Sequence, residues 1–380
     1  MLTGILVRLV GYQRYKSRGD RFYLAGDYRR ALIAYRSARS LLSVTDVRLA
    51  AVEPLLRECA ERTGLADRRS FFSSDLASDA EGASFQPGIS DLFELAIAGK
   101  PEERAALYRG LGAEFEAGYV ALVRGEGVEA VRRLQAAARG RPPAFIVELE
   151  LGRAESLVAD FESAARSLEK AVRLSPADPE ALNLLAAVRL ERGEFQEALD
   201  TLAPLDPLLL NGRAGAEILF VSARALAALG QPQAALGRLK EAVGKASGFH
   251  EAYFEGGQLL LAAGDVQGAF SAFRAACSIE PGEVSYNRCL ARLVLGHGGH
   301  DGPLGLEVRE GLAACDRLMV TDEENRWQYL GWIAELYLRK GWRREARDPL
   351  EKALELIPAE KSEERRGIER RLAELSEPTR

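Results

Sequence analysis

Small, apolar and charged residues recur in the same order along this chain. The phrases that repeat this order are GDYRRALIAYRSA at 26–38, ADFESAARSLEKAVRLSP at 159–176, GEFQEALDTL at 193–202 and GDVQGAFSAFRAACSIEP at 264–281. In each phrase the small and apolar residues fall three and four apart, the spacing that places them on one face of an α-helix. Self-similarity of this kind is typical of repeat proteins, in which each unit packs only on its neighbours. The pattern therefore predicts an elongated array of helices.

A period of 34 residues fits these phrases. Its units start at Tyr12, Leu111, Phe145, Pro179, Ala216, His250, Val284 and Trp327. All eight hold Gly or Ala at their eighth position, and all but the unit from Val284 hold Ala at position 20 and Leu or an aromatic residue at position 24. We expect the two helices of a unit to approach most closely where positions 8 and 20 meet, because larger residues there would push them apart.

This pattern resembles the tetratricopeptide repeat. That family places a small residue at position 8, Gly near 15, Ala at 20, an aromatic residue or Leu at 24, Ala at 27 and Pro at 32, and the glycine and the proline end the two helices. The resemblance implies an all-α, right-handed superhelical solenoid of helix-turn-helix repeats, similar to bacterial scaffold proteins of this family. It also implies that the chain binds other proteins.

Departures from the period divide the chain. Residues 1–64 are expected to form a module with one clear repeat and a degenerate helix, in which Glu53 stands where a small residue should and Pro54 lies inside the helix. Residues 65–90, rich in Ser, Asp, Ala and Gly, are expected to form a flexible linker. Residues 91–359 then form the main array of about seven repeats, whose first helical hairpin is degenerate, and residues 360–380 a capping helix and tail. Extra residues around 206–212 and 296–305 are expected to be loops.

Composition supports a helical, non-membrane protein. Apolar residues make up 47% of the chain and charged residues 28%, while aromatic residues make up only 7%. The net charge of -5 argues against a general affinity for nucleic acid. The four cysteines are far apart, without the spacing of a disulfide framework or zinc site, so we expect a cytoplasmic protein. No run of about 18 apolar residues suggests a membrane span.

Motifs that suggest catalysis have simpler explanations. The stretch from Gly125 to Ala130 fits G-x-G-x-x-A, but it follows a helix, and repeat positions 15, 17 and 20 already account for it. His297, His300 and Asp301 offer metal ligands in a glycine-rich insertion, where a flexible turn is the simpler interpretation. No Ser or Cys has a visible His and acidic partner. We expect no enzymatic activity, no cofactor and no metal.

The resemblance also implies where a partner would bind. In this family the first helices line a concave groove, and ligands usually touch positions 2, 5, 9 and 12. Those positions hold Phe115, Tyr119, Arg153, Asn183, Phe220, Arg224, Phe254, Gln258, Arg288 and Arg292. Their aromatic rings, guanidinium groups and amides suit an extended acidic or aromatic segment of a protein partner. Two alternatives stay open: the aromatic residues seal contacts between repeats, or the partner docks on the convex face or the insertions.

A second class of function is that of a membrane-peripheral envelope, secretion or assembly factor. Residues 1–18 hold Leu2, Ile5, Leu6 and Leu9 together with Arg8, Arg14, Lys16 and Arg18. An amphipathic helix of this kind lies on anionic lipid. The same apolar residues would alternatively pack on the first repeat or pair with a second copy of the chain, so self-association is also an open alternative.

Co-sedimentation with anionic vesicles tests the lipid hypothesis. The full chain should sediment with the vesicles and a chain lacking residues 1–11 should not, because the deletion removes the apolar residues that would enter the lipid. Equal sedimentation of the two chains would remove the lipid hypothesis and leave packing on the first repeat or self-association.

Overall fold

The computed structural model describes most of the chain from residue 89 onward. The described residues are 28, 31, 35, 49–62, 89–97, 100–139, 142–205, 212–297 and 308–376. Among these residues every regular element is a helix and none is a strand. The prediction of an all-α fold is therefore confirmed. Residues 1–18, for which a lipid-binding helix was predicted, and residues 65–88 of the predicted linker 65–90 lie outside the described residues, while Ile89 and Ser90 begin a helix.

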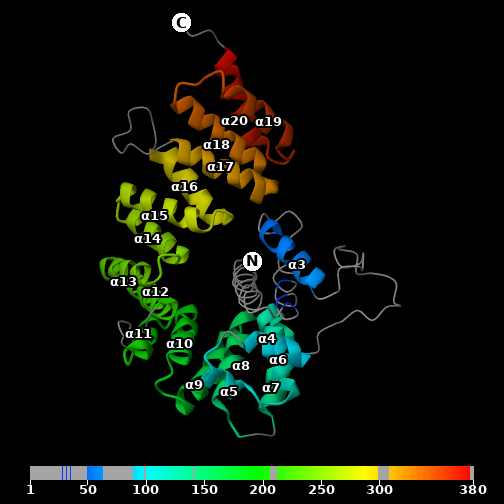
Figure 1. Ribbon diagram of the computed structural model, residues 1–380. Coiled ribbons are helices and arrows are strands. Elements are labelled where there is room, and N and C mark those ends of the chain that lie inside the picture. The colour runs from blue at the N-terminus through cyan, green and yellow to red at the C-terminus, as the bar shows by residue number, and fades with distance from the viewer. Residues whose placement is uncertain are drawn as a thin grey trace. The chain divides into compact units, whose positions relative to one another are not determined.

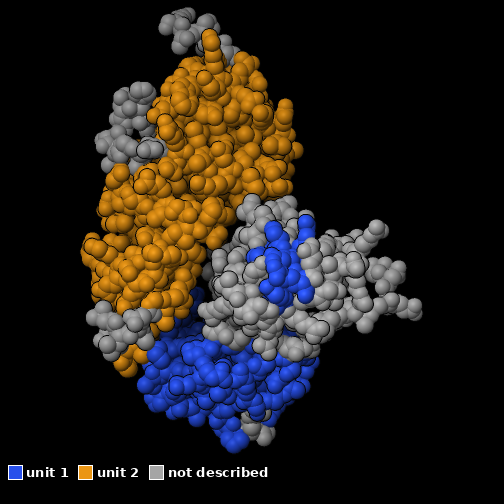
Figure 2. Space-filling model, viewed as in Figure 1, with its two compact units in different colours: residues 1–194 blue, residues 195–380 orange. Residues whose placement is uncertain are grey.

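The chain divides into two compact units, residues 1–194 and 195–380 (Figure 2). The division falls between two helices of one predicted repeat, inside the range 91–359 that the sequence predicts as one array. The helices of unit 1 are α3 (Leu49–Arg62), α4 (Ile89–Ile97), α5 (Glu102–Tyr108), α6 (Ala113–Arg124), α7 (Gly127–Ala138), α8 (Phe145–Leu157), α9 (Phe161–Leu174) and α10 (Pro179–Glu191) (Figure 1).

Unit 2 continues the same pattern. Its helices are α11 (Phe195–Leu202), α12 (Gly212–Ala228), α13 (Pro232–Lys245), α14 (His250–Ala262), α15 (Val266–Ile279), α16 (Val284–His297), α17 (Val308–Thr321), the short 3-10 helix η2 (Glu323–Asn325), α18 (Arg326–Arg339), α19 (Arg347–Leu356) and α20 (Ser362–Ser376). From α6 to α10 in unit 1 and from α11 to α20 in unit 2, helices consecutive in sequence pack side by side, as α8 does with α9 and α14 with α15, while α4 packs on α6. Four first helices, α8, α10, α14 and α16, begin at the residues predicted to start their repeats.

Close approach of paired helices depends on the small residue at position 8. A Cβ atom placed on Gly152 would lie 2.5 Å from Cγ of Leu168, and one placed on Gly257 would lie 2.6 Å from Cε1 of Phe273. Both partners occupy position 24, whereas position 20 approaches Gly152 only through the carbonyl oxygen of Ala164, at 3.3 Å. Gly152 therefore meets position 20 through the backbone, while the side chain at position 24 fills the space that the glycine leaves.

In the repeat from Val284, the small residue at the contact between the two helices is one that the 34-residue period did not identify. Its second helix, α17, starts at Val308, after residues 298–307, which lie outside the described part. A Cβ atom on Gly311 in α17 would lie 2.9 Å from Cγ1 of Val294 and 3.2 Å from Cδ1 of Leu336. Here a glycine of the second helix lies at the helix contact. The insertion shifts the phase of the repeat, which is why the period did not find this residue.

Unit 2 ends on a helix that covers its last repeat. Ile368 of α20 is buried in one apolar cluster with Leu330 of α18 and Leu350 of α19. Leu372 and Leu375 pack against the same cluster, so the apolar side of α20 contacts the repeat. Its other face carries the charged residues of the sequence SEERRGIERRLAELS.

Turns between paired helices repeat one backbone conformation. A residue with a left-handed backbone follows the first helix at Gly125, Gly193, Gly230, Gly264 and Gly341, with φ between 75° and 82°. In the repeat from Phe145 the corresponding residue is Ala159, with φ of 63°. Its N–H donates to the carbonyl of Ser156 at 3.1 Å, so the turn closes as in the other repeats. A left-handed alanine is strained by contact of its Cβ atom with the backbone.

Ala159→Gly should therefore stabilise the protein. We expect the free energy of unfolding to rise by about 1 kcal/mol, because relief of the left-handed strain outweighs the extra chain entropy of glycine. Ala136→Gly is the matched control: Ala136 is exposed in helix α7, and there the change should cost about 0.5–1 kcal/mol. Urea denaturation followed by circular dichroism measures both. A loss of stability in both variants would contradict the strain at Ala159.

Candidate functional site

The ten predicted groove residues come from six first helices. Phe115 and Tyr119 lie on α6, Arg153 on α8 and Asn183 on α10, all in unit 1. Those of unit 2 lie on α12, α14 and α16 and are Phe220, Arg224, Phe254, Gln258, Arg288 and Arg292. Each unit therefore has its own set of predicted groove residues.

Phe115 and Tyr119 belong to the core of unit 1. Their side chains are 0% and 1% exposed. Phe93 of α4 lies over both rings, with centroids 6.2 Å and 6.0 Å away, and Tyr108 of α5 lies 5.1 Å from the ring of Tyr119. These edge-to-face contacts bury all four rings together. A bound peptide would have to displace α4 or α5 to touch either predicted residue.

Arg153 lies between two acidic residues. Its guanidinium nitrogen is 3.4 Å from Oε2 of Glu150, and it forms a second ion pair with Glu180 of α10. The Glu150 side chain is fully buried, and Oε1 accepts a hydrogen bond from the hydroxyl of Tyr108. Burial and the adjacent Glu150 raise the pKa of Tyr108, so it stays a hydrogen-bond donor.

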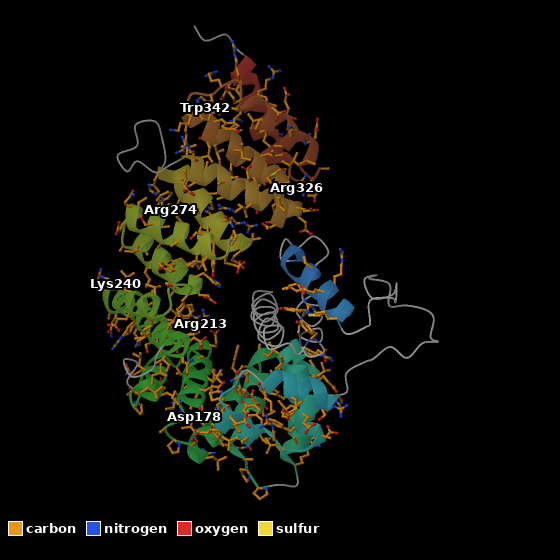
Figure 3. The ribbon with its side chains drawn as sticks, viewed as in Figure 1. Asp178, Arg213, Lys240, Arg274, Arg326 and Trp342 are labelled. Atoms are coloured by element: carbon orange, nitrogen blue, oxygen red, sulfur yellow. The ribbon has the colours of Figure 1, made fainter. Side chains whose placement is uncertain are left out.

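Asp178, the N-cap of α10, and Glu180 in its first turn form ion pairs with Arg104 of α5. Arg104 places one nitrogen 2.5 Å from Oδ2 of Asp178 and another 2.9 Å from Oε2 of Glu180 (Figure 3 labels Asp178). Oδ1 of Asp178 also accepts the N–H of Ala181 at 2.9 Å and so caps α10. Burial disfavours the charged form of Glu180, but the nearby cations Arg153, Lys100 and Arg104 outweigh it and lower its pKa to about 2. We call Glu150, Asp178 and Glu180 the acidic surface of unit 1.

Asn183, one turn after Glu180, is half-buried on the same helix. Its side-chain oxygen is shielded from solvent and accepts no hydrogen bond from the described residues. A buried amide oxygen without a donor costs free energy, so this atom is a potential acceptor for an incoming N–H group.

The predicted aromatic residues of unit 2 are half-buried. Phe220 packs on Phe249, with ring centroids 5.1 Å apart, and Phe254 packs on Tyr286 at 4.5 Å and Phe273 at 5.6 Å. Since Tyr286 belongs to the next repeat, Phe254 seals the contact between two repeats and still leaves part of its ring exposed.

Arg288 is held in place by the repeat that follows it. Its guanidinium lies 2.5 Å from Oδ2 of Asp322 and donates to the hydroxyl of Tyr329 at 2.8 Å and 3.1 Å. Burial and the hydrogen bond to Asp322 raise the pKa of Tyr329 to about 12. Two of its three nitrogens, Nε and one terminal nitrogen, are therefore already bonded within the protein.

Three predicted residues of unit 2 keep accessible polar groups. Gln258 and Arg292 are exposed, and Arg292 makes no ion pair or side-chain hydrogen bond within the part of the chain that the structure describes. Arg224 is half-buried, and its guanidinium is 3.9 Å from Glu255. Burial raises the pKa of that glutamate, an effect that Arg224 partly offsets.

Sequence reasoning missed the acidic surface and the residues that contact it. The groove positions do not include Glu150 or Asp178, and Arg104 and Tyr108 lie in the hairpin that was predicted to start the array. One signal in the sequence points to them: Lys100, Arg104 and Tyr108 are spaced by four, so they share one side of a helical segment.

Catalytic and metal chemistry find little support in the described residues. They contain no cluster of three His, Cys, Asp or Glu side chains that would hold a metal ion. His297 is exposed at the end of α16, whereas His300 and Asp301 lie outside the described part. Burial raises the pKa of Cys277 and of Cys315 to about 12, which disfavours a thiolate nucleophile. No helix in the described ranges is long and apolar enough to cross a bilayer.

Solved structures resemble parts of the chain. A tetratricopeptide repeat protein from Parabacteroides merdae is 18% identical, with a TM-score of 0.42, over 72% of this chain and 100% of its own. MamA is 22% identical, with a TM-score of 0.38, over 46% of this chain and 97% of its own. YrrB, described as a TPR protein with an unusual peptide-binding site, is 20% identical, with a TM-score of 0.37, over 51% of this chain and 94% of its own. No curated protein matches the chain.

Family models identify the repeats directly. Three models of the tetratricopeptide repeat match residues 159–216, 220–284 and 328–360. The matched ranges contain α13, α14, α15 and most of α12. In these helices the small residues at position 8, Ala223 and Gly257, are buried at the contact between paired helices. The chain belongs to the tetratricopeptide-repeat superfamily.

Proposed function

We propose that this protein is a non-enzymatic scaffold that holds segments of partner proteins against the first helices of its repeats, within a multiprotein assembly. Tetratricopeptide repeats are in general protein-interaction modules, and this supports the proposal. The observation that carries it is the surface of unit 2, where Gln258 of α14 and Arg292 of α16 are exposed and the ring of Phe254 on α14 is half-buried. Folding alone does not require an exposed arginine without an acidic partner.

The chemistry of this surface favours an extended acidic or aromatic segment. Arg292 offers a guanidinium group for a carboxylate, and Gln258 offers an amide for peptide backbone. Phe254 supplies a partly exposed ring on the same helix as Gln258. We place Arg224, Gln258 and Arg292 at the centre of the proposed groove and assign the buried Phe115 and Tyr119 to the core.

We propose the cytoplasm as the compartment. Cys277 and Cys315 are buried thiols, and Cys289 is half-buried. Thiols persist where the environment is reducing. The absence of catalysis is also part of the proposal and rests on the lack of a nucleophile with a base beside it among the described residues.

Charge reversal tests the groove of unit 2. Arg224→Glu together with Arg292→Glu should weaken the binding of peptides that combine Asp or Glu with Phe or Tyr, because two attractive contacts become repulsive. We expect a loss of about 2–4 kcal/mol, roughly 30- to 1000-fold in Kd. Fluorescence anisotropy with a labelled set of such peptides measures the change.

Lys240→Glu together with Arg274→Glu is the matched control. These exposed cations lie on the second helices α13 and α15 (Figure 3), so the net charge changes equally while the proposed groove is untouched. The Lys240 and Arg274 variant should melt as the parent does, since exposed substitutions change stability by about 0.5 kcal/mol, and thermal melting checks that the Arg224 and Arg292 variant is folded. If the Arg224 and Arg292 variant keeps its peptide while deletion of residues 297–303 abolishes binding, the groove assignment is wrong and the insertion binds the partner.

A further inference from the structure

Helix α5 contacts unit 1 through the buried residues Ala105 and Tyr108 and through Arg104. Arg104 and Tyr108 lie one turn apart and both contact α8 or α10, while the ammonium group of Lys100 lies 4.5 Å above the ring of Tyr108. The other side of the helix faces solvent, and Leu107 is 52% exposed there. The segment 100–108 therefore presents two cations and a tyrosine on one side, as a peptide ligand does.

The residues that receive this segment come from the first helices of two consecutive repeats. Glu150 lies at position 6 of the repeat from Phe145, and Glu180 lies at position 2 of the repeat from Pro179. Arg104 is held by Asp178 and Glu180 together, and Tyr108 is held by Glu150. Binding across neighbouring first helices is the arrangement proposed for partner segments in unit 2.

Two buried acceptor atoms at or beside the acidic surface accept no hydrogen bond from α5. Glu150 is fully buried, yet its Oε2 atom accepts no hydrogen bond within the described residues and has only Arg153 nearby, at 3.4 Å. The shielded oxygen of Asn183 on α10 likewise accepts none. These acceptors go beyond what a helix that only caps the array would need, because a buried acceptor without a donor is destabilising.

Helix α5 has little stability of its own. It spans seven residues, and Pro101, at its N-cap, provides no side-chain hydrogen bond. Isolated helices of this length are marginal in water, so α5 persists through the bonds of Arg104 and Tyr108 to the acidic surface and through the packing of the Tyr108 ring on α6. The bonds of Arg104 and of the Tyr108 hydroxyl involve ionised carboxylates, the kind of contact that a competing segment with the same groups can replace.

We infer that the acidic surface of unit 1 binds helical segments that carry cations and a tyrosine one turn apart, and that residues 100–108 are its resident occupant. The inference rests on the proposed function in that first helices hold partner segments, but it assigns a second surface with the opposite charge preference. A partner helix with this pattern replaces α5 and forms the same ion pairs with Glu180 and Asp178.

Competition in trans tests the inference. The probe is a fluorescent peptide with the sequence of residues 99–110, and the proteins are the full chain and a variant with Arg104→Ala and Tyr108→Phe. The variant keeps the buried ring but loses the groups that contact the acidic residues. The peptide should bind the variant at least about tenfold more tightly than the parent, since in the parent the tethered segment competes at high effective concentration.

Three controls make the result specific. Adding Glu180→Arg to the variant should abolish peptide binding, and a peptide with Glu in place of its Lys and Arg residues should not bind. Adding Arg224→Glu and Arg292→Glu should leave binding unchanged, so failure of the unit 2 groove is distinguishable from failure here. Equal affinity of the peptide for parent and variant, or equal binding of the charge-reversed peptide, would overturn the inference and leave α5 as a structural cap.

Hydrogen exchange on the unmodified chain tests the same point without any variant. Amides of residues 102–108 should exchange at least about a hundredfold faster than those at the centres of α6 and α8, because the resident segment leaves the surface without unfolding the repeats. Exchange of α5 at the rate of α6 and α8 would mean that it opens only on unfolding, and the surface would then not be available to a partner.

Discussion

Paired helices in this protein share a core only where one of them has almost no side chain. At Gly152 even a methyl group would lie 2.5 Å from Leu168, so the distance between α8 and α9 is set by backbone against leucine. Where the residue is alanine, as at Ala186 and Ala334, the methyl group is fully buried and takes part of that space. The other contacts of a repeat follow from this approach, because it fixes which residues of the second helix face inward.

This constraint explains why much of the fold was predictable. The two positions that make this contact, 8 and 24, are only about 16 residues apart. The same types of residue therefore recur at these positions from repeat to repeat. Helices begin at the predicted residues Phe145, Pro179, His250 and Val284 for that reason. The position of α5 was not predictable, because its hydrogen bonds join residues 42 and 76 positions apart and occur once. Gly311 was missed because the preceding insertion moves it out of phase.

The candidate site was harder to predict than the fold. A position in the repeat fixes the direction of a side chain, but it does not say which other helix covers that side chain. Phe115 and Tyr119 point where the pattern places them and are nevertheless buried by α4 and α5. Arg288 likewise meets Asp322, which follows α17, whereas Arg292, one turn later, meets no partner among the described residues. Accessibility depends on these single contacts, which leave no periodic signal.

Helix α8 carries three buried carboxylates, and each depends on a different group. Glu148 lies 3.5 Å from Lys170, Glu150 accepts from Tyr108, and Glu155 accepts from Ser167 at 2.8 Å. Burial raises the pKa of Glu155, so this carboxylate is tolerated only beside its own donors. A copy of this repeat would carry Lys170 and Ser167 of α9 with it but not Tyr108 of α5, so a copy inserted elsewhere in the array would bury Glu150 without its hydrogen-bond donor.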